Sequence, residues 1–166
     1  GNIEWPFEPA TNESEMDEQY EKGFLVFNPH EMFPGDIEEA FNFFCYYSWE
    51  KAQVDPFETK LVGSDEIQLL IDNWTISKEF RSIIQTGRNY STDFIAVSQQ
   101  INEVHNKIRS QMTELVTFFH DDALVLKNLE KRRFDPVEVS SLKVPGEFIA
   151  RNVLTGTQTR GFLRLT

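Results

Sequence analysis

Short apolar runs alternate along the chain with longer stretches in which apolar side chains recur every three or four residues. The short runs predict buried β-strands, and the longer stretches predict helices with one apolar face. The predicted strands cover Gly23–Phe27, Thr59–Ser64, Phe94–Val97 and Leu115–Phe119. The predicted helices cover Ile37–Lys51, Ile67–Trp74, Ser77–Gly87, Ile101–Met112 and Asp121–Lys131, and a further short helix is predicted to begin at Asp135–Pro136.

The two ends of the chain differ from this middle part. At the start, Ile3, Trp5 and Phe7 alternate with polar or turn residues, which is compatible with the end of a strand, and the acidic stretch Glu8–Lys22 predicts an exposed loop. At the other end, residues 147–152 and 160–164 alternate in polarity around a Thr155–Gly156 turn, which predicts a β-hairpin. Strands that alternate with helices indicate an α/β fold with a largely parallel sheet, followed here by that hairpin.

The helix that Asp36 is expected to cap is unusually rich in aromatic residues. Its apolar face needs Ile37, Ala40, Phe41, Phe44 and Cys45, and further aromatic side chains lie outside that face. These extra side chains fit either a thick core or a second buried contact, for example with a neighbouring subunit.

Composition sets limits on the function. The 166 residues suit one domain, and 40% hydrophobic residues with 15 phenylalanines support a folded core. The net charge of -11 opposes binding of nucleic acid or anionic membrane by bulk electrostatics, although a ring-shaped motor can keep an acidic exterior and place a few cations at its pore.

The single cysteine, Cys45, cannot form a disulfide within the chain, and its apolar surroundings predict a buried side chain in a protein of a reducing compartment. No apolar stretch approaches the ~18 residues of a membrane span, and no signal-peptide pattern opens the chain. His30, His105 and His120 are too widely spaced to predict a metal site.

Two polar pairs follow predicted strands directly, Asp65–Glu66 and Ser98–Gln99. Ligands of parallel sheets bind beyond the carboxyl ends of the strands, so these pairs lie where a nucleotide site would be. Hydrolysis of ATP needs a carboxylate in the Mg²⁺ shell and a group that orients water, which an Asp-Glu pair can supply. Two acidic residues also favour a helix N-terminus without any catalytic role, so the pair alone leaves both interpretations open.

Three segments occur in a characteristic order: Asp65-Glu66-Ile67-Gln68, then Thr86–Tyr90 with Gly87-Arg88, then Phe94–Gln100 with Ser98-Gln99. Together with Ser110–Glu114 they resemble the FtsK/HerA class of P-loop DNA translocases, which includes viral genome-packaging ATPases. The resemblance spans roughly Leu61 to Leu129. It implies a P-loop NTPase fold of the RecA/ASCE type, with a mostly parallel sheet flanked by helices, and ATP and Mg²⁺ as cofactors.

The resemblance also implies roles for single residues. Asp65 would hold Mg²⁺ through water, Glu66 would activate water, and Ser98–Gln99 would contact the γ-phosphate, with Gln99 as the sensor. Arg88 would be an arginine finger that acts on a neighbouring subunit, and Arg81 and Arg109 are weaker candidates for that role. From the residues alone, Gln99 also fits a polar loop position, and Arg88 also fits a salt bridge or a helix end.

The family requires a glycine-rich loop with Lys and Ser/Thr before the Asp-Glu strand, and the 166 residues contain no such motif. We therefore expect the loop and the first βα unit to lie upstream of Gly1, and the chain alone to be inactive. With that loop, the expected function is the ATPase motor of a ring-shaped homo-oligomer, expected to be a hexamer, that moves double-stranded DNA.

The resemblance further implies capsid or portal-type partners and a location in the cytoplasm or in the virion of an infected host cell. The alternative is a non-catalytic α/β scaffold or interaction domain with a degenerate nucleotide site.

A basic cluster is formed by Lys127, Lys131, Arg132 and Arg133. The cluster fits a contact with DNA, but the solvated end of a helix is the favoured interpretation.

Overall fold

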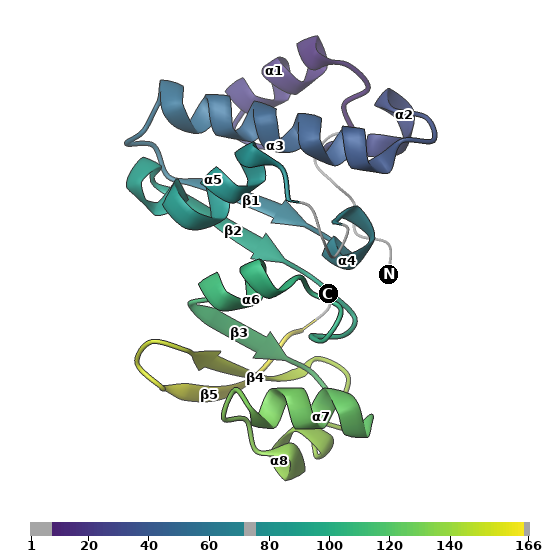
Figure 1. Ribbon diagram of the computed structural model, residues 1–166, viewed down its shortest axis with the longest axis vertical. Coiled ribbons are helices and arrows are strands. Elements are labelled where there is room, and N and C mark those ends of the chain that lie inside the picture. The colour runs from purple at the N-terminus through teal and green to yellow at the C-terminus, as the bar shows by residue number, and fades with distance from the viewer. Residues whose placement is uncertain (1–7, 72–75, 165–166) are drawn as a thin grey trace. The chain divides into compact units, whose positions relative to one another are not determined.

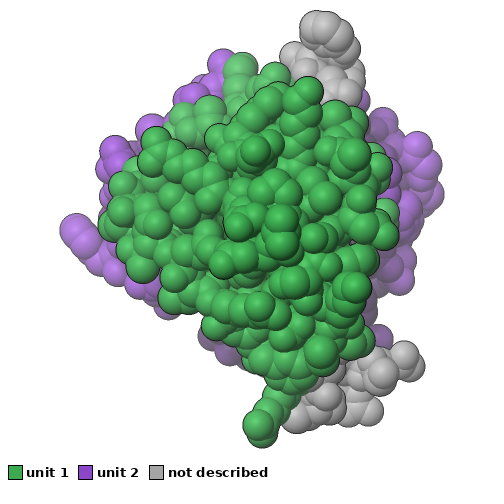
Figure 2. Space-filling model, turned by 90° about the horizontal axis from the view of Figure 1, so that it is seen from below, with its two compact units in different colours: residues 1, 98–166 green, residues 2–97 purple. Residues whose placement is uncertain are grey.

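The computed structural model describes residues 8–71 and 76–164, and the chain divides into two compact units at Val97 and Ser98. Figure 2 colours the surface of each unit separately. The predictions for Ile3, Trp5 and Phe7 and for the helix end at Trp74 lie outside the described residues. The prediction of a single domain for residues 1–166 stays a prediction.

The unit that ends at Val97 is built around a pair of parallel strands, β1 and β2, with helices packed on one face (Figure 1). Lys60 pairs with Thr92 and Ser64 with Ala96, so the two strands begin and end level with each other. The described elements are α1 (Glu13–Glu21), α2 (Pro29–Met32), α3 (Ile37–Val54), β1 (Lys60–Ser64), α4 (Ile67–Leu70), α5 (Lys78–Thr86), the 3-10 helix η1 (Gly87–Tyr90) and β2 (Thr92–Ala96).

Phe80 connects the helices of this unit to its sheet. Its side chain is fully buried on α5 and makes edge contacts with Phe41 of α3 and Phe94 of β2, at ring-centroid distances of 5.2 and 5.0 Å. Such aromatic contacts add to the stabilisation from burial itself. One side chain therefore holds two helices and a strand in place.

The capping signals of α3 and α5 form as predicted. The side chain of Asp36 accepts a hydrogen bond from Glu39 N, and that of Ser77 accepts one from Phe80 N. These bonds satisfy backbone N–H groups that have no partner within the helix, which is why each helix begins there.

Most of the additional aromatic side chains of α3 contact aromatic rings elsewhere in the same chain. Phe43 and Phe44 contact Phe27, Tyr47 contacts Tyr20, and Trp49 contacts Tyr90. The thick-core interpretation therefore accounts for these side chains.

The second unit, from Ser98 onward, contains an antiparallel sheet in the order β3-β4-β5, with a helical layer seen in Figure 1. Its core includes Val125, Leu129, Phe134, Val139 and Ile149, each at most 2% exposed. The predicted hairpin forms as β4 and β5. The elements are α6 (Asn106–Gln111), β3 (Glu114–Thr117), α7 (Ala123–Glu130), α8 (Pro136–Ser140), β4 (Glu147–Asn152) and β5 (Gln158–Phe162).

The prediction of a largely parallel sheet is wrong for the described residues. Only β1 and β2 run parallel, whereas β3 pairs with the hairpin strand β4 in antiparallel register. The strand predicted at Leu115–Phe119 was expected to belong to the parallel sheet, and the structure forms it as β3. The hairpin offers β3 a neighbouring strand in the same unit, and apolar patterning does not reveal strand direction.

Two predictions for the first 27 residues are also wrong. Residues 13–21 form α1 instead of a loop, because Asn12 caps Glu15 N while the Glu15 carboxylate accepts from Thr11 N, at 3.0 and 2.7 Å. Only Met16 is buried in this helix, which explains the missing periodicity. The apolar run 23–27 makes a single bridge, between Ala10 and Phe27, and packs through Phe27 on α3 rather than forming a strand.

Two helices are shorter than predicted. In the first, α4 covers only Ile67–Leu70, and residues 72–75 lie outside the described part. In the second, α6 begins at Asn106, after turns at 101–104, because His105 Nδ1 accepts a hydrogen bond from Lys107 N and caps the helix there.

We predict that Phe80→Ala lowers the free energy of unfolding by about 3–5 kcal/mol, because it removes a buried ring and leaves a cavity between α3, α5 and β2. Phe57, which is 91% exposed, is the matched control. Phe57→Ala should change stability by less than about 0.5 kcal/mol. Urea unfolding monitored by circular dichroism measures both, and equal effects would show that Phe80 does not occupy this core position.

Candidate functional site

The loop that carries Asp65 and Glu66 is fastened to one residue of the neighbouring strand. Val97 N donates a hydrogen bond to Ser64 O at 2.9 Å, and Val97 O accepts one from Ile67 N at 3.0 Å. Asp65 and Glu66 therefore form a short loop, and the residues on both sides of it are hydrogen-bonded to Val97. Ile67, which is 1% exposed, anchors the end of this loop in the core.

Glu66 adopts a left-handed backbone conformation, with φ 46° and ψ 45°. This conformation is costly for residues with a Cβ, and such strain in proteins is concentrated at functional sites. Glu66 N donates to Asp65 Oδ1 at 2.9 Å, and Leu69 N donates to Glu66 O at 2.8 Å. These bonds stabilise the strained turn.

The acidic pair suits a magnesium ion that is bound mainly by phosphate and water. Asp65 is exposed and Glu66 half-buried, at the carboxyl end of β1. Among the described residues no group of three or more His, Cys, Asp and Glu side chains could hold a metal. Mg²⁺ commonly uses one or two protein carboxylates and takes its other ligands from water and phosphate. The residues present fit that mode and do not fit a cage made only of protein groups.

Arg88 lies at the opposite end of the strand pair. It belongs to η1, which leads into the beginning of β2, and Ser91 O accepts a hydrogen bond from Lys60 N at the beginning of β1. The length of β1, about 13 Å at 3.3 Å per residue, separates this end from Asp65 and Glu66. Arg88 is exposed, and no described side chain forms an ion pair with it.

Ser98 and Gln99 follow Val97 directly but belong to the second unit. Ser98 Oγ donates to Gln100 O at 3.0 Å, so this hydroxyl supports the local turn. The structure thus brings Asp65 and Glu66 together and places Arg88 at the other end of the strands. A site that also includes Ser98 and Gln99 stays a prediction.

Sequence reasoning missed Val97 as the residue that fixes the acidic loop. The apolar pattern marked it as the end of a strand, but a backbone clamp uses no side-chain chemistry and leaves no signal in the sequence. The left-handed conformation of Glu66 was equally hidden, because glycine is the usual marker of such positions.

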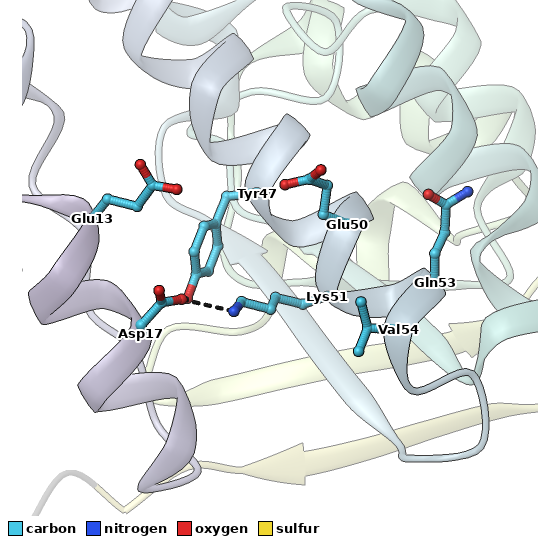
Figure 3. A pocket seen from close by; sticks show the side chains of 7 residues that line it. All are labelled: Glu13, Asp17, Tyr47, Glu50, Lys51, Gln53 and Val54. Carbon is cyan, nitrogen blue, oxygen red and sulfur yellow. Dashed lines mark hydrogen bonds and ion pairs between the residues drawn. The ribbon is translucent and has the colours of Figure 1, made fainter.

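A separate cavity of about 340 Å³ lies between α1 and α3 (Figure 3). Asp17 there accepts hydrogen bonds from Lys51 Nζ at 2.7 Å and Tyr47 OH at 2.8 Å. Lys51 and then Tyr47 lower the pKa of Asp17, and burial followed by the Asp17 carboxylate raises the pKa of Tyr47. These contacts fasten α1 to α3, and none of the predicted site residues lines the cavity.

We predict that Glu66→Gly is more stable than Glu66→Ala by about 1 kcal/mol, because glycine adopts the left-handed conformation without the Cβ clash. Both variants remove the carboxylate, so their difference isolates the backbone strain. Urea unfolding of the two proteins measures it. An alanine variant as stable as the glycine variant would contradict a strained Glu66.

Comparison with solved structures identifies the fold. The genome packaging NTPase B204 of Sulfolobus turreted icosahedral virus 2, in complex with ATP-gammaS, superposes with a TM-score of 0.75 at 14% identity, over 95% of this chain and 74% of that one. B204 of Sulfolobus turreted icosahedral virus, a DNA-packaging ATPase, gives 0.64 at 12% identity, over 86% and 66%. VirB4 of Thermoanaerobacter pseudethanolicus gives 0.61 at 14% identity, over 86% and 42%.

No protein-family model and no curated protein matches the sequence. In the described residues, no helix has both the length and the apolar character needed to cross a membrane. The structural neighbours confirm the resemblance at the level of the fold: this chain has the α/β fold of P-loop NTPases, as found in a viral genome-packaging ATPase and in VirB4.

Proposed function

We propose that this chain is the Asp-Glu-to-sensor part of an ATP-hydrolysing motor that moves double-stranded DNA. The observation that carries the proposal is the acidic loop at the carboxyl end of β1, fixed on Val97 within a fold shared with nucleotide-bound packaging NTPases. In parallel sheets this edge is where ligands bind. A rigid loop also suits the chemistry, because phosphoryl transfer depends mainly on positioning and electrostatic stabilisation.

Each predicted residue has a role in this proposal. Asp65 holds the water shell of Mg²⁺, which when bound neutralises charge on the phosphates. Glu66 accepts a proton from the attacking water, and its strained backbone fixes the direction of the carboxylate. The side-chain amide of Gln99 donates a hydrogen bond to an oxygen of the γ-phosphate and accepts one from that water. Ser98 contacts the same phosphate group.

The position of Arg88 supports action between subunits. About 13 Å of strand separates it from the acidic pair of its own chain, which favours a nucleotide on another copy as its target. A planar guanidinium with several donors suits phosphate charge that is spread over several oxygens. We therefore propose a ring-shaped homo-oligomer, with six subunits as the expected size and with capsid or portal-type partners.

One observation favours the alternative of a non-catalytic scaffold with a degenerate nucleotide site. Leu61 of β1 is 66% exposed, so the strand before the acidic pair is only partly buried. A scaffold would bind a partner through such surfaces and would not hydrolyse ATP.

We predict that Glu66→Gln lowers kcat for ATP hydrolysis by about 10²–10⁴-fold while ATP binding is retained, because the amide cannot accept the proton of water. Hydrolysis is measured with the product of the complete reading frame that contains these residues, and binding with a fluorescent ATP analogue. Glu50→Gln, in the cavity on α3, is the control and should leave kcat unchanged. Absence of hydrolysis in the unaltered protein would favour the scaffold.

For Arg88 the expected result is complementation between inactive subunits. Arg88→Ala and Glu66→Gln should each abolish hydrolysis alone, and mixing them should restore part of it, since a mixed interface can pair an intact Glu66 with an intact Arg88. Arg81→Ala on the neighbouring helix tests the weaker candidate for this role and should remain active if Arg88 is the finger. If mixed subunits stay inactive although they assemble, Arg88 does not act between subunits.

A further inference from the structure

The positive charge of the second unit is concentrated at the end of α7. Residues 98–166 contain ten Lys and Arg against eight Asp and Glu, which gives +2. Residues 127–135 alone contain four against two, which also gives +2, so the rest of the unit is neutral. Charges are largely screened beyond about 10 Å at 0.1 M salt. This local excess, rather than the net charge of -11, therefore determines whether a polyanion can bind at the end of α7.

Helix α7 ends in a hydrogen-bonded turn that contains no glycine. Phe134 N donates to Leu129 O at 3.2 Å, and Arg133 N donates to Glu130 O at 2.7 Å. These two bonds form the Schellman motif, which satisfies carbonyl groups at the end of a helix. Leu129 and Phe134 are each 2% exposed and belong to the same core cluster. The backbone that carries the basic side chains is therefore held by the core.

Arg133 occupies the position of this motif at which glycine is usual. Its φ is 66°, in the left-handed region that is costly for a residue with a Cβ. Glycine would complete the same two hydrogen bonds without that cost. The helix dipole favours cations near the last turn, but Lys127 and Lys131 already supply that charge. Because strain of this kind is concentrated at functional sites, we expect the arginine side chain to serve a purpose other than folding.

Three cations at this end of α7 face solvent. Lys127, Lys131 and Arg133 are exposed, and none of them forms a salt bridge within the described part of the chain. Lys127 and Lys131 are four residues apart and therefore lie on the same face of the helix. Of the two acidic residues nearby, Glu130 is exposed in the last turn, and the Asp135 carboxylate caps α8 by accepting a backbone hydrogen bond at 2.8 Å.

We propose that Lys127, Lys131 and Arg133 bind the phosphate backbone of double-stranded DNA at the end of α7. A DNA strand presents a regular row of single negative charges, and exposed lysines and arginines at neighbouring positions can contact several of them. Phosphate contacts carry no sequence information directly, which suits a protein that moves along DNA of any sequence. The identity of this partner rests on the proposed function, but the surface itself requires neither hydrolysis of ATP nor the acidic loop.

The first experiment measures binding of a fluorescein-labelled 20-base-pair duplex to the product of the complete reading frame, by anisotropy between about 50 and 200 mM salt without ATP. Lys127→Ala/Lys131→Ala should bind about tenfold or more weakly, and the slope of log affinity against log salt should fall by about two. The control is Arg160→Ala, which removes a cation that is paired with Glu147 at 3.1 Å and should change affinity less than about twofold. An equal loss in the control, an unchanged slope in the double variant, or no duplex binding by the unaltered protein would overturn the proposal.

The second experiment separates binding from folding at Arg133. Arg133→Gly should weaken duplex binding and lower the salt slope by about one, yet raise the melting temperature, because glycine relieves the left-handed strain. Arg133→Lys keeps both the charge and the strain, so its salt slope and melting temperature should match those of the unaltered protein. Melting is followed by circular dichroism. A glycine variant with a lower melting temperature and unchanged duplex affinity would identify Arg133 as structural and contradict the proposal.

An acidic surface of a second copy is the other partner that these cations could meet. Residues 1–97 contain six Lys and Arg against nineteen Asp and Glu, which gives -13. Sedimentation velocity of Lys127→Ala/Lys131→Ala tests this partner. If the variant no longer assembles but binds the duplex as the unaltered protein does, the surface joins subunits and the proposal of a DNA contact is wrong.

Failure of this inference and failure of the proposed function give different results. If the unaltered protein does not hydrolyse ATP but loses duplex affinity in the α7 variants, the motor is wrong and the DNA contact stands. If it hydrolyses ATP but the same variants bind the duplex normally, the motor stands and the DNA contact is wrong.

Discussion

Two hydrogen bonds made by the backbone of Val97 fix the part of the chain on which the candidate chemistry depends. They connect Val97 to Ser64 and Ile67, on either side of the acidic pair. If β2 shifted by one residue, these bonds would be lost and the side chains of the strand would exchange faces. The register of β1 with β2 therefore decides where Asp65 and Glu66 lie, and it does so without using their own side chains.

That register is held from one side by aromatic packing. Phe80 contacts Phe94 of β2 and Phe41 of α3, so the strand cannot slide without moving two helices. A pair of parallel strands without cover is rarely stable, because parallel sheets normally bury both faces. On the other face, Leu61 and Ile95 are 66% and 49% exposed in this chain. The packed face therefore holds β2 in register, and the other face presents exposed apolar side chains.

Sequence reasoning succeeded where a local signal and tertiary packing agree. Asp36 and Ser77 cap their helices as predicted, and the turn at Gly156 joins the predicted hairpin strands. It failed for α1. Met16 is the only buried residue of this helix, and a single buried position produces no apolar periodicity in the sequence. It also could not foresee strand direction for β3 or the backbone of Glu66, because both depend on neighbours distant in sequence.

The position of Arg88 bears on the proposed function. The resemblance predicted that Arg88 acts on a neighbouring subunit, and the parallel register places Arg88 at the other end of the strands from Asp65 of its own chain. Within one chain this separation does not favour a contact of Arg88 with a group bound at Glu66. Between two copies arranged head to tail it becomes an advantage, because the amino end of one strand pair can face the carboxyl end of the next. A heterologous contact of this kind forms a closed ring when its rotation closes. The separation of Arg88 from Glu66 within one chain is therefore the feature that the proposed action of Arg88 on a neighbouring copy would explain.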